Sequence, residues 1–263
     1  MIYIIFLYIF TVCETKISIN ITATPYLYKT AVKYEGNDIK TITDKEIILF
    51  NITKNNLNKG VKVELGNISD DIFLKEPTPN ALYRKYKWPE VKRKLIVKSV
   101  TVLKFIKKDE VLQTHVFINN TPDTIKTRVD LNENVENIVS FKWSEKGLPD
   151  DEVFFDLNVY FENGNLSFVQ KWRTEKLQSV RLPINTSKVI VENEPGNILT
   201  SELIASKIIL LLEVEFQASL IGNVITDYKK VYGSYHYYSP TVQNIMRAGK
   251  IKNEILTKKG SNV

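Results

Sequence analysis

The chain has very few of the residues that covalent cross-links and metal sites require. Among 263 residues there are one cysteine, Cys13, and two histidines, His115 and His236. Cleavage of a leader after Cys13 would leave no cysteine, so stability must then come from the core and the sheets rather than from disulfides. Because metal sites need clusters of ligands, we expect both histidines to be structural or surface residues and no metal to be bound.

Catalytic motifs are also lacking. The chain contains no nucleophile-elbow motif and no phosphate-binding loop. The acidic run 150–152 could suggest acid/base or metal chemistry, but its position just before a strand-like segment favours a solvated loop. We therefore expect a protein that is not an enzyme and that needs no cofactor.

The charge balance is basic, with a net charge of +6 and a pI near 9.1. Such a charge favours encounter with anionic surfaces, among them cell-surface polyanions and nucleic acid. No helical basic region or zinc-binding pattern accompanies it, and secretion would make nucleic acid a poor partner. The alternative is a solvated basic surface without a specific partner.

The N-terminal segment Met1 to Cys13 is almost wholly apolar and carries no charge. It is too short to span a membrane as a helix but suits the apolar core of a signal peptide, so residues 1–15 predict a secreted, extracellular protein. The alternative is a buried N-terminal strand. Six Asn-X-Ser/Thr acceptors agree with a glycosylated secretory protein: Asn20, Asn51, Asn67, Asn119, Asn165 and Asn185.

Short runs rich in β-branched and aromatic residues alternate with Asn, Gly, Asp and Pro along most of the chain, which predicts strands. The expected strands include 17–23, 47–52, 60–66, 95–106 and 111–118 (with a turn at 107–110), parts of 124–142, 180–183, 189–191 and 207–225. One helix is expected over Thr241 to Ala248, with Ser239 as N-cap, Pro240 at its first position and Gly249 as C-cap. The pattern predicts an all-β, elongated protein with long twisted antiparallel strands, an amphipathic hairpin and one short C-terminal helix. A boundary near residue 98 would divide it into an N-terminal surface-binding region, 16–98, and a second β module, 99–263.

Residues Val153 to Thr174 form the clearest pattern, an amphipathic β-hairpin. Apolar and polar residues alternate up to Asn163-Gly164, a dipeptide that favours a tight two-residue turn. That turn would place Phe161 opposite Leu166, and Asp156 opposite Lys171. Since a tilted strand needs about 9–11 residues to cross a bilayer, the hairpin suits either half of a β-sandwich core or a segment that enters a membrane.

A second candidate site lies in the Pro-containing stretch 75–94, which contains seven basic residues. Its members Tyr83, Arg84, Tyr86 and Trp88 combine ring faces with positive charge, which suits contact with carbohydrate or lipid headgroups. The alternative is a surface loop whose aromatic rings pack on the nearest sheet.

From residue 117 onward an ordered series of segments resembles the aerolysin-type β-pore-forming superfamily, which includes epsilon-toxin/Mtx2-like and spherulin-like members. The segments are Phe117-Ile-Asn-Asn-Thr-Pro-Asp, the strand Val129 to Trp143, the hairpin, Gln178-Ser-Val-Arg-Leu-Pro-Ile-Asn-Thr, and Ala218-Ser-Leu-Ile-Gly-Asn-Val. The resemblance covers roughly the C-terminal half and rests on the order of these segments.

The resemblance implies a secreted protein that binds a cell-surface receptor or glycan, assembles into a homo-oligomer and inserts its hairpins into the membrane as a closed barrel, since lipid cannot satisfy unpaired backbone groups. The implied lipid-facing residues are Val153, Phe155, Leu157, Val159, Phe161, Leu166, Phe168 and Trp172. The implied lumen-facing residues are Asp156, Asn158, Glu162, Ser167, Lys171 and Arg173.

The hairpin departs from the family pattern. It has few Ser and Thr residues, carries Phe154, Tyr160 and Val169 on the lumen side, and has Gln170 on the lipid side, with the Asn165 acceptor at its tip. A second interpretation is therefore a non-lytic secreted binding or structural glycoprotein of the same fold.

Overall fold

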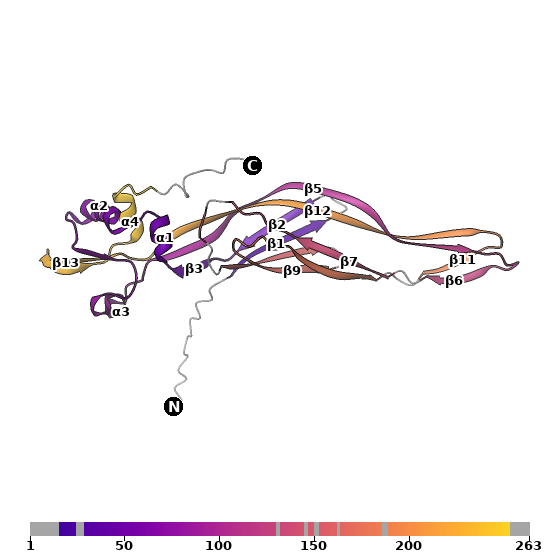
Figure 1. The fold of residues 1–263 in the computed structure, drawn as a ribbon, viewed down its shortest axis with the longest axis horizontal. Coiled ribbons are helices and arrows are strands. Elements are labelled where there is room, and N and C mark those ends of the chain that lie inside the picture. The colour runs from indigo at the N-terminus through magenta and orange to yellow at the C-terminus, as the bar shows by residue number, and fades with distance from the viewer. Residues whose placement is uncertain are drawn as a thin grey trace, which may run out of the picture.

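The computed structural model describes residues 16–24, 29–129, 132–144, 147–149, 153–161, 164–185 and 189–252. The predicted signal peptide, 1–15, lies outside the described residues. The described chain is an elongated, mostly β structure, as the sequence predicts, with a helix-containing head at one end and long strands running away from it (Figure 1).

Two long strands form the spine of the molecule. β5 (Lys92–Ile118) and β12 (Ile198–Ile221) pair antiparallel along their whole lengths, and β3 (Asp38–Thr41) extends this sheet at the end near the head. The predicted turn at 107–110 is wrong, because these polar residues continue β5 opposite Lys207 and its neighbours on β12. Residue 98, where the sequence predicts a domain boundary, lies within β5.

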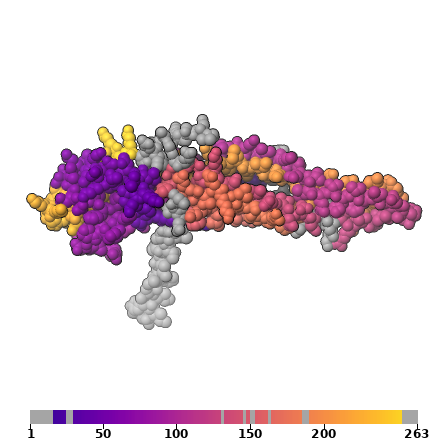
Figure 2. Space-filling view, in the orientation of Figure 1, coloured from indigo at the N-terminus to yellow at the C-terminus, as the bar shows by residue number. Residues whose placement is uncertain are grey.

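The spine folds back on itself at its far end. β6 (Ile125–Val129) pairs with β11 (Val189–Asn193), and β7 (Asn132–Val139) pairs with β10 (Gln178–Asn185). The segment that follows β5 and the segment that precedes β12 therefore stay paired with each other. The fold-back is fixed by Asn119, whose side-chain amide donates to the carbonyl oxygens of Asp123 and Asn193, each at 2.8 Å. The space-filling view shows the narrow far end that results (Figure 2).

A four-stranded sheet lies against the spine. Its strand order is β2-β1-β8-β9. The strands are β1 (Ile17–Thr24), β2 (Lys29–Glu35), β8 (Phe154–Phe161) and β9 (Gly164–Lys171). The main core lies between this sheet, the spine and the nearest helices, and it includes Ile19, Leu95, Phe155 and Leu220.

The head combines a small sheet with short helices. β4 (Asp71–Phe73), β13 (Ile225–Tyr232) and β14 (Tyr235–Tyr238) form the sheet. Around it lie α1 (Asp44–Leu49), α2 (Lys54–Leu65), the 3-10 turn η2 (Pro79–Ala81), α3 (Leu82–Tyr86) and α4 (Val242–Ala248). The head therefore combines residues from both halves of the sequence.

The C-terminal helix is confirmed, with a small shift. Thr241, rather than Ser239, is its N-cap, because the Thr241 hydroxyl accepts a hydrogen bond from the Asn244 N–H. Gly249 is the C-cap as predicted.

Two predicted strands in the head are helices instead. Residues 47–52 belong to α1 and the turn after it, where Thr43 and Glu46 form a reciprocal capping box that starts the helix. Residues 60–66 belong to α2 and its C-cap, Gly66. In α2 the buried residues are Leu57, Gly60 and Val61, a helical spacing, whereas Val63 is exposed.

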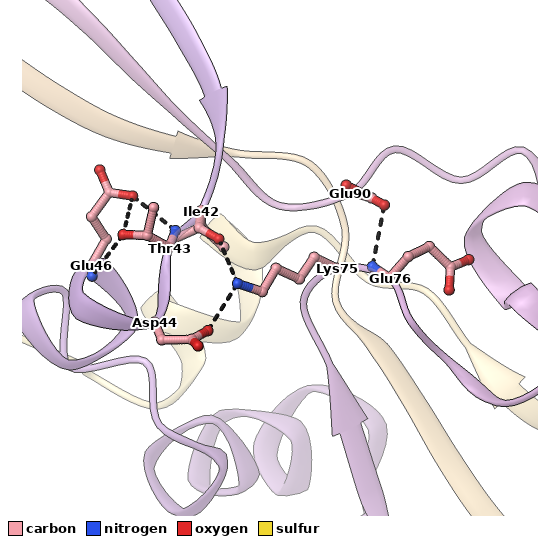
Figure 3. Close-up of polar contacts among 7 residues, drawn as sticks. All are labelled: Ile42, Thr43, Asp44, Glu46, Lys75, Glu76 and Glu90. Carbon is pink, nitrogen blue, oxygen red and sulfur yellow. Dashed lines mark hydrogen bonds and ion pairs between the residues drawn. The ribbon is translucent and has the colours of Figure 1, made fainter. Parts of the chain in front are cut away.

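Charged side chains join the head to the spine. Lys75 donates to the Ile42 carbonyl oxygen at 3.1 Å and to Asp44 at 2.8 Å, and Glu90 accepts from the Glu76 N–H (Figure 3). Beside them the fully buried Arg93 of β5 forms ion pairs with Glu46 of α1, at 2.7 Å, and with Asp38 of β3, at 2.9 Å. Because a buried charge that loses its partner is costly, these pairs fix β3 and α1 on the spine.

Candidate functional site

The predicted hairpin is present as β8 and β9, but its register differs from the prediction. Phe161 pairs with Gly164, Val159 with Leu166 and Leu157 with Phe168. This register is two residues away from the one that an Asn163-Gly164 turn would give, so Asp156 faces Val169 rather than Lys171. Since side chains alternate with a period of two, a shift of two residues leaves every residue on its predicted face.

The face predicted to meet lipid is turned into the core of the described structure. Phe155, Leu157 and Phe168 are buried, whereas Val159 and Phe161, nearer the hairpin tip, are half-buried. Val153, Leu166 and Trp172 complete the buried set. The burial therefore weakens from the base of the hairpin towards its tip.

Five aromatic rings fix the base of the hairpin. Trp143 lies 4.8 Å from Trp172 between ring centroids, and Phe216 of β12 lies 4.9 Å from Trp172 and 5.6 Å from Phe155. Phe141 packs edge-on against Phe155 at 5.7 Å. The contribution of Phe141, Trp143 and Phe216 was missed in the sequence because it depends on contacts between distant segments.

Gln170, the one polar residue of the buried face, has its hydrogen bonds satisfied within the base. Its side-chain nitrogen donates to the carbonyl oxygens of Lys171 and Thr174, and its oxygen accepts from Gln178 at 2.7 Å. A fully buried amide is stable in such a setting because each polar atom has a partner. Gln170 therefore marks the junction of β9 with β10.

The opposite face of the hairpin is polar with apolar exceptions. Asp156 forms an ion pair with Lys16 at 2.5 Å, and Asn158 donates to Asn20 at 2.9 Å. Phe154, Tyr160 and Val169 are exposed on the same face, and Ser167 and Lys171 lie there too. Arg173 lies just beyond β9, where it donates to the Leu148 carbonyl oxygen, while Glu162 falls outside the described residues.

An elongated cleft of about 2620 Å³ separates the hairpin sheet from the spine. Val159, Phe161 and Leu166 line it from the hairpin, and Leu210 and Leu212 line it from β12. Phe155 and Trp172 at the base of the hairpin line the cleft as well, together with Phe216 of β12, so the cleft follows the apolar face of the hairpin from its base to its tip.

The position of the hairpin in the chain is equally specific. β7 precedes the hairpin and β10 follows it. These two strands pair along their whole lengths, from Val139 opposite Gln178 to Asn132 opposite Asn185. The hairpin is therefore the innermost member of a nested series of antiparallel pairs, and it could continue the β7–β10 ribbon if it left the sheet.

The aromatic and basic stretch of the head divides into a buried part and an exposed part. Tyr83 is buried, and its hydroxyl donates to the carbonyl oxygens of Phe73 and Asn223 at 2.8 and 2.9 Å. Burial raises the pKa of Tyr83. These contacts make Tyr83 a structural residue rather than a surface-binding one.

The exposed part centres on Tyr86, which forms an aromatic patch with the half-buried rings of Trp88 and Tyr237. Tyr86 stacks on Trp88 with 4.6 Å between ring centroids, and Tyr237 of β14 lies 6.4 Å from Tyr86. The Lys85 ammonium lies over the Tyr86 ring, and Arg84 is exposed beside it. Tyr237 could not be assigned to this patch from the sequence, because β14 is far from α3 along the chain.

The glycosylation acceptors lie in different settings. Asn51, Asn67 and Asn165 are exposed, and Asn20 is half-buried within β1. Asn119 is fully buried and its amide is used in the fold-back, so a glycan there would disrupt these contacts. Asn185 lies at the end of β10.

Both histidines lie within strands. His115 stacks on Phe117 in β5, and the Nδ1 atom of His236 lies 2.8 Å from the Tyr228 carbonyl oxygen. Within the described ranges no cluster of three or more His, Cys, Asp or Glu residues could hold a metal ion. In the same part of the chain no helix has the length and apolar character to cross a membrane.

The chain is similar over most of its length to proteins that are named as toxins. U-megalopygitoxin(8)-Mo12 from Megalopyge opercularis is 26% identical over 233 residues, which are 87% of this chain and 81% of that protein. U-megalopygitoxin(8)-Mc8 from Megalopyge crispata is 25% identical over the same shares of the two chains. No protein-family model matches the chain.

Among solved structures, the parasporin-2 Bacillus thuringiensis toxin that recognizes cancer cells has a TM-score of 0.47 and 15% identity, with 80% of this chain and 87% of that chain covered. A non-toxic crystal protein from Bacillus thuringiensis has a TM-score of 0.34 and 10% identity, with 64% and 77% covered. Both TM-scores are below 0.5, so the assignment to the all-β class is based on the strands of the described chain and not on these two structures.

Proposed function

We propose that this chain is a secreted, toxin-like protein that binds a cell surface, forms a homo-oligomer and inserts the β8–β9 hairpin into the membrane. The observation that carries the proposal is the hairpin's continuous apolar face, which is covered by the core in the described state. Apart from Gln170, this face is apolar from Val153 to Trp172, so it can exchange a protein core for lipid with one polar side chain to accommodate.

Three further observations support the proposal. The hairpin lies between two strands that are already paired, so its release would lengthen the β7–β10 ribbon. The resemblance to aerolysin-type proteins rests on the same order of segments. The match to the relatives named megalopygitoxins extends over 87% of the chain and therefore spans the hairpin region.

The aromatic patch is the proposed cell-surface site. Tyr86, Trp88 and Tyr237 offer ring faces to a glycan or to lipid headgroups, and the neighbouring Arg84 and Lys85 favour an anionic surface. We propose no enzymatic activity, no cofactor and no nucleic acid partner.

A matched pair of variants tests the insertion step. Val159→Asp places a carboxylate on the apolar face, where insertion would move it into lipid; such charges on the lipid face cost up to a few kcal/mol near the bilayer midplane. Val169→Asp makes the same chemical change on the opposite face of the same hairpin, where Val169 is already exposed. We expect Val159→Asp to lower dye release from cultured cells at least tenfold while cell binding is retained, and Val169→Asp to change release less than twofold.

Equal dye release from Val159→Asp and the parent chain would remove the hairpin from the mechanism. Circular dichroism and thermal unfolding would show whether each variant is folded. Phe161→Asp, also on the apolar face near the tip, gives an independent repeat of the test.

The second candidate function is a non-lytic secreted binding glycoprotein. The observation that favours it is the exposed acceptor Asn165, which lies next to Gly164 at the start of β9, near the hairpin tip. A glycan there would oppose entry into a bilayer. A glycosylated Asn165 in the natural protein, together with no dye release, would support this function instead.

A further inference from the structure

The four-stranded sheet consists of two hairpins joined along one line. β1 pairs antiparallel with β2, and β8 pairs antiparallel with β9. The two hairpins meet only where β1 pairs with β8, and this is the single parallel ladder among the described strands. β9 pairs with no described strand other than β8, so β1 is the only neighbour that holds the insertion hairpin in a sheet.

The β1–β2 hairpin is itself attached to the spine. β2 leads directly into β3, which pairs with β5, and Arg93 of β5 holds Asp38 of β3. The Tyr34 hydroxyl of β2 donates to the Lys98 carbonyl oxygen of β5 at 3.1 Å. The two hairpins therefore differ in their anchoring: β1–β2 is continuous with β3, which pairs with the spine, whereas β8–β9 is held by β1 and by its packed face.

The β1–β8 ladder has one apolar side and one polar side. Towards the core, Ile17 pairs with Phe155, Ile19 with Leu157 and Ile21 with Val159. All three isoleucines are buried. Away from the core the contacts are hydrogen bonds and an ion pair, between Asn158 and Asn20 and between Asp156 and Lys16.

Two physical arguments make the β1–β8 ladder weaker than the two antiparallel ladders of the same sheet. Parallel pairing is slightly less stable per residue than antiparallel pairing. The Lys16–Asp156 ion pair is partly exposed, and such pairs contribute little. A hairpin that leaves this sheet as a unit must break the β1–β8 ladder and can keep the β8–β9 ladder intact.

We propose that β1–β2 is an autoinhibitory clasp, which keeps the β8–β9 hairpin in its soluble position and must separate from β8 before insertion. This inference rests on the proposed function and adds the contact that controls it. Separation would uncover Ile17, Ile19 and Ile21 together with the apolar face of β8, so the clasp opens only transiently in water, and a membrane or a second copy of the chain stabilises the open form by covering the released hairpin.

Two disulfide variants that share one cysteine test the clasp. Asn20→Cys/Asn158→Cys would join β1 to β8, and Asn158→Cys/Ser167→Cys would join β8 to β9; both pairs are in register. Facing residues on neighbouring strands lie within the roughly 4.4–6.8 Å between Cα atoms that disulfides accept. Both variants carry Cys13→Ser, which removes the natural cysteine of the chain. Both are made in a host that does not glycosylate, because Asn20→Cys removes the Asn20 acceptor and Ser167→Cys removes the Asn165 acceptor.

Under oxidising conditions we expect the β1–β8 disulfide to lower dye release at least tenfold, from cultured cells and from phosphatidylcholine–phosphatidylserine vesicles, and a reductant to restore it. The β8–β9 disulfide should leave release within twofold of its reduced form, since the hairpin stays paired when it inserts. Undiminished release from the oxidised β1–β8 variant would overturn the clasp, whereas a normal response to Val159→Asp in the same assay would leave the proposed function standing.

Amide hydrogen exchange of the parent chain gives a test that does not depend on dye release. Alternate amides of a central strand bond to opposite neighbours, so β8 reports on both ladders. We expect the β8 and β1 amides of the β1–β8 ladder to exchange at least tenfold faster than those of the β8–β9 ladder. Equal protection of the two ladders would contradict the clasp even if the protein released no dye.

Discussion

Three aspartates crowd one another in the sheet of the head. Asp227 of β13 lies opposite Asp71 of β4, and the Asp70 N–H donates to the Asp227 carbonyl oxygen at 2.9 Å. Burial raises the pKa of the Asp227 carboxyl above its ordinary value of 3.8, and the charges of Asp71 and Asp70 raise the pKa further. An ionised Asp227 is therefore a cost to the folded state at neutral pH.

We expect Asp227→Asn to unfold at a higher temperature than the parent chain at pH 7. The folded state holds this proton at a higher pH than the unfolded chain does, so lowering the pH through the raised pKa stabilises the parent chain relative to the variant. The difference in Tm should thus shrink as the pH falls towards 3.8. Calorimetric scans at several pH values measure it.

Asp123→Asn, which changes an exposed aspartate at the far end of the molecule, is the matched control for the loss of one negative charge. A pH-independent difference in Tm between Asp227→Asn and the parent chain would contradict the assigned cause.

Single residues also show what a sequence pattern cannot predict. Tyr83 and Tyr86 lie in one stretch, yet Tyr83 is buried with two hydrogen bonds and Tyr86 is exposed in the aromatic patch.

At the scale of elements, the contact between α2 and α4 depends on one glycine. A Cβ atom on Gly60 would lie 2.1 Å from the Ile245 carbonyl oxygen of α4. Val61 and Ile245 are fully buried around this contact. The two helices can approach this closely only because position 60 has no side chain.

We expect Gly60→Ala to lower the free energy of unfolding by about 1–3 kcal/mol, the range for overpacked cores, although alanine is the better helix former. Chemical denaturation measures this change. Glu64→Ala, at an exposed position of the same helix, should change it by less than about 0.5 kcal/mol. A Gly60→Ala variant as stable as the parent chain would show that the helices can separate without cost.

The strand content and the faces of the hairpin could be predicted from the sequence, because alternation over eight residues leaves little choice of side. The register could not be predicted: the rule for Asn-Gly turns is local, and the observed pairing of Phe161 with Gly164 is two residues away from the one that the rule gives. The sequence predicts a strand where α2 forms, because Val61, Val63 and Leu65 alternate, and only the packing against α4 shows that Val63 faces solvent. The parallel ladder of the proposed clasp joins segments that are distant in sequence and leaves no local pattern.

At the scale of the whole molecule, head and body are not consecutive segments of the chain. The spine leaves the head as β5 and returns to it as β12, so both ends of the proposed insertion module are tied to the same small sheet and helices. The aromatic patch lies in this head, and the hairpin lies in the body (Figure 1). Surface binding and insertion are thus assigned to regions that the spine connects.

The nested pairing of β8–β9, β7–β10, β6–β11 and β5–β12 also has a consequence for how the chain reaches its fold. The innermost pair closes a short loop, while Lys92 and Ile221 at the outer end are joined across more than a hundred residues. Each pair brings the ends of the next together, so the loop-closure entropy is spread over successive small steps instead of falling on one large step.

We therefore expect folding to begin at the hairpin and to spread outward along the ribbon. Pulsed hydrogen exchange during refolding should protect the amides of β8–β9 before those where Lys92 meets Ile221, and protection in the opposite order would contradict this route. The segment assigned to entering a membrane would then be the first part of the molecule to find its partner, and β1 would cover it afterwards.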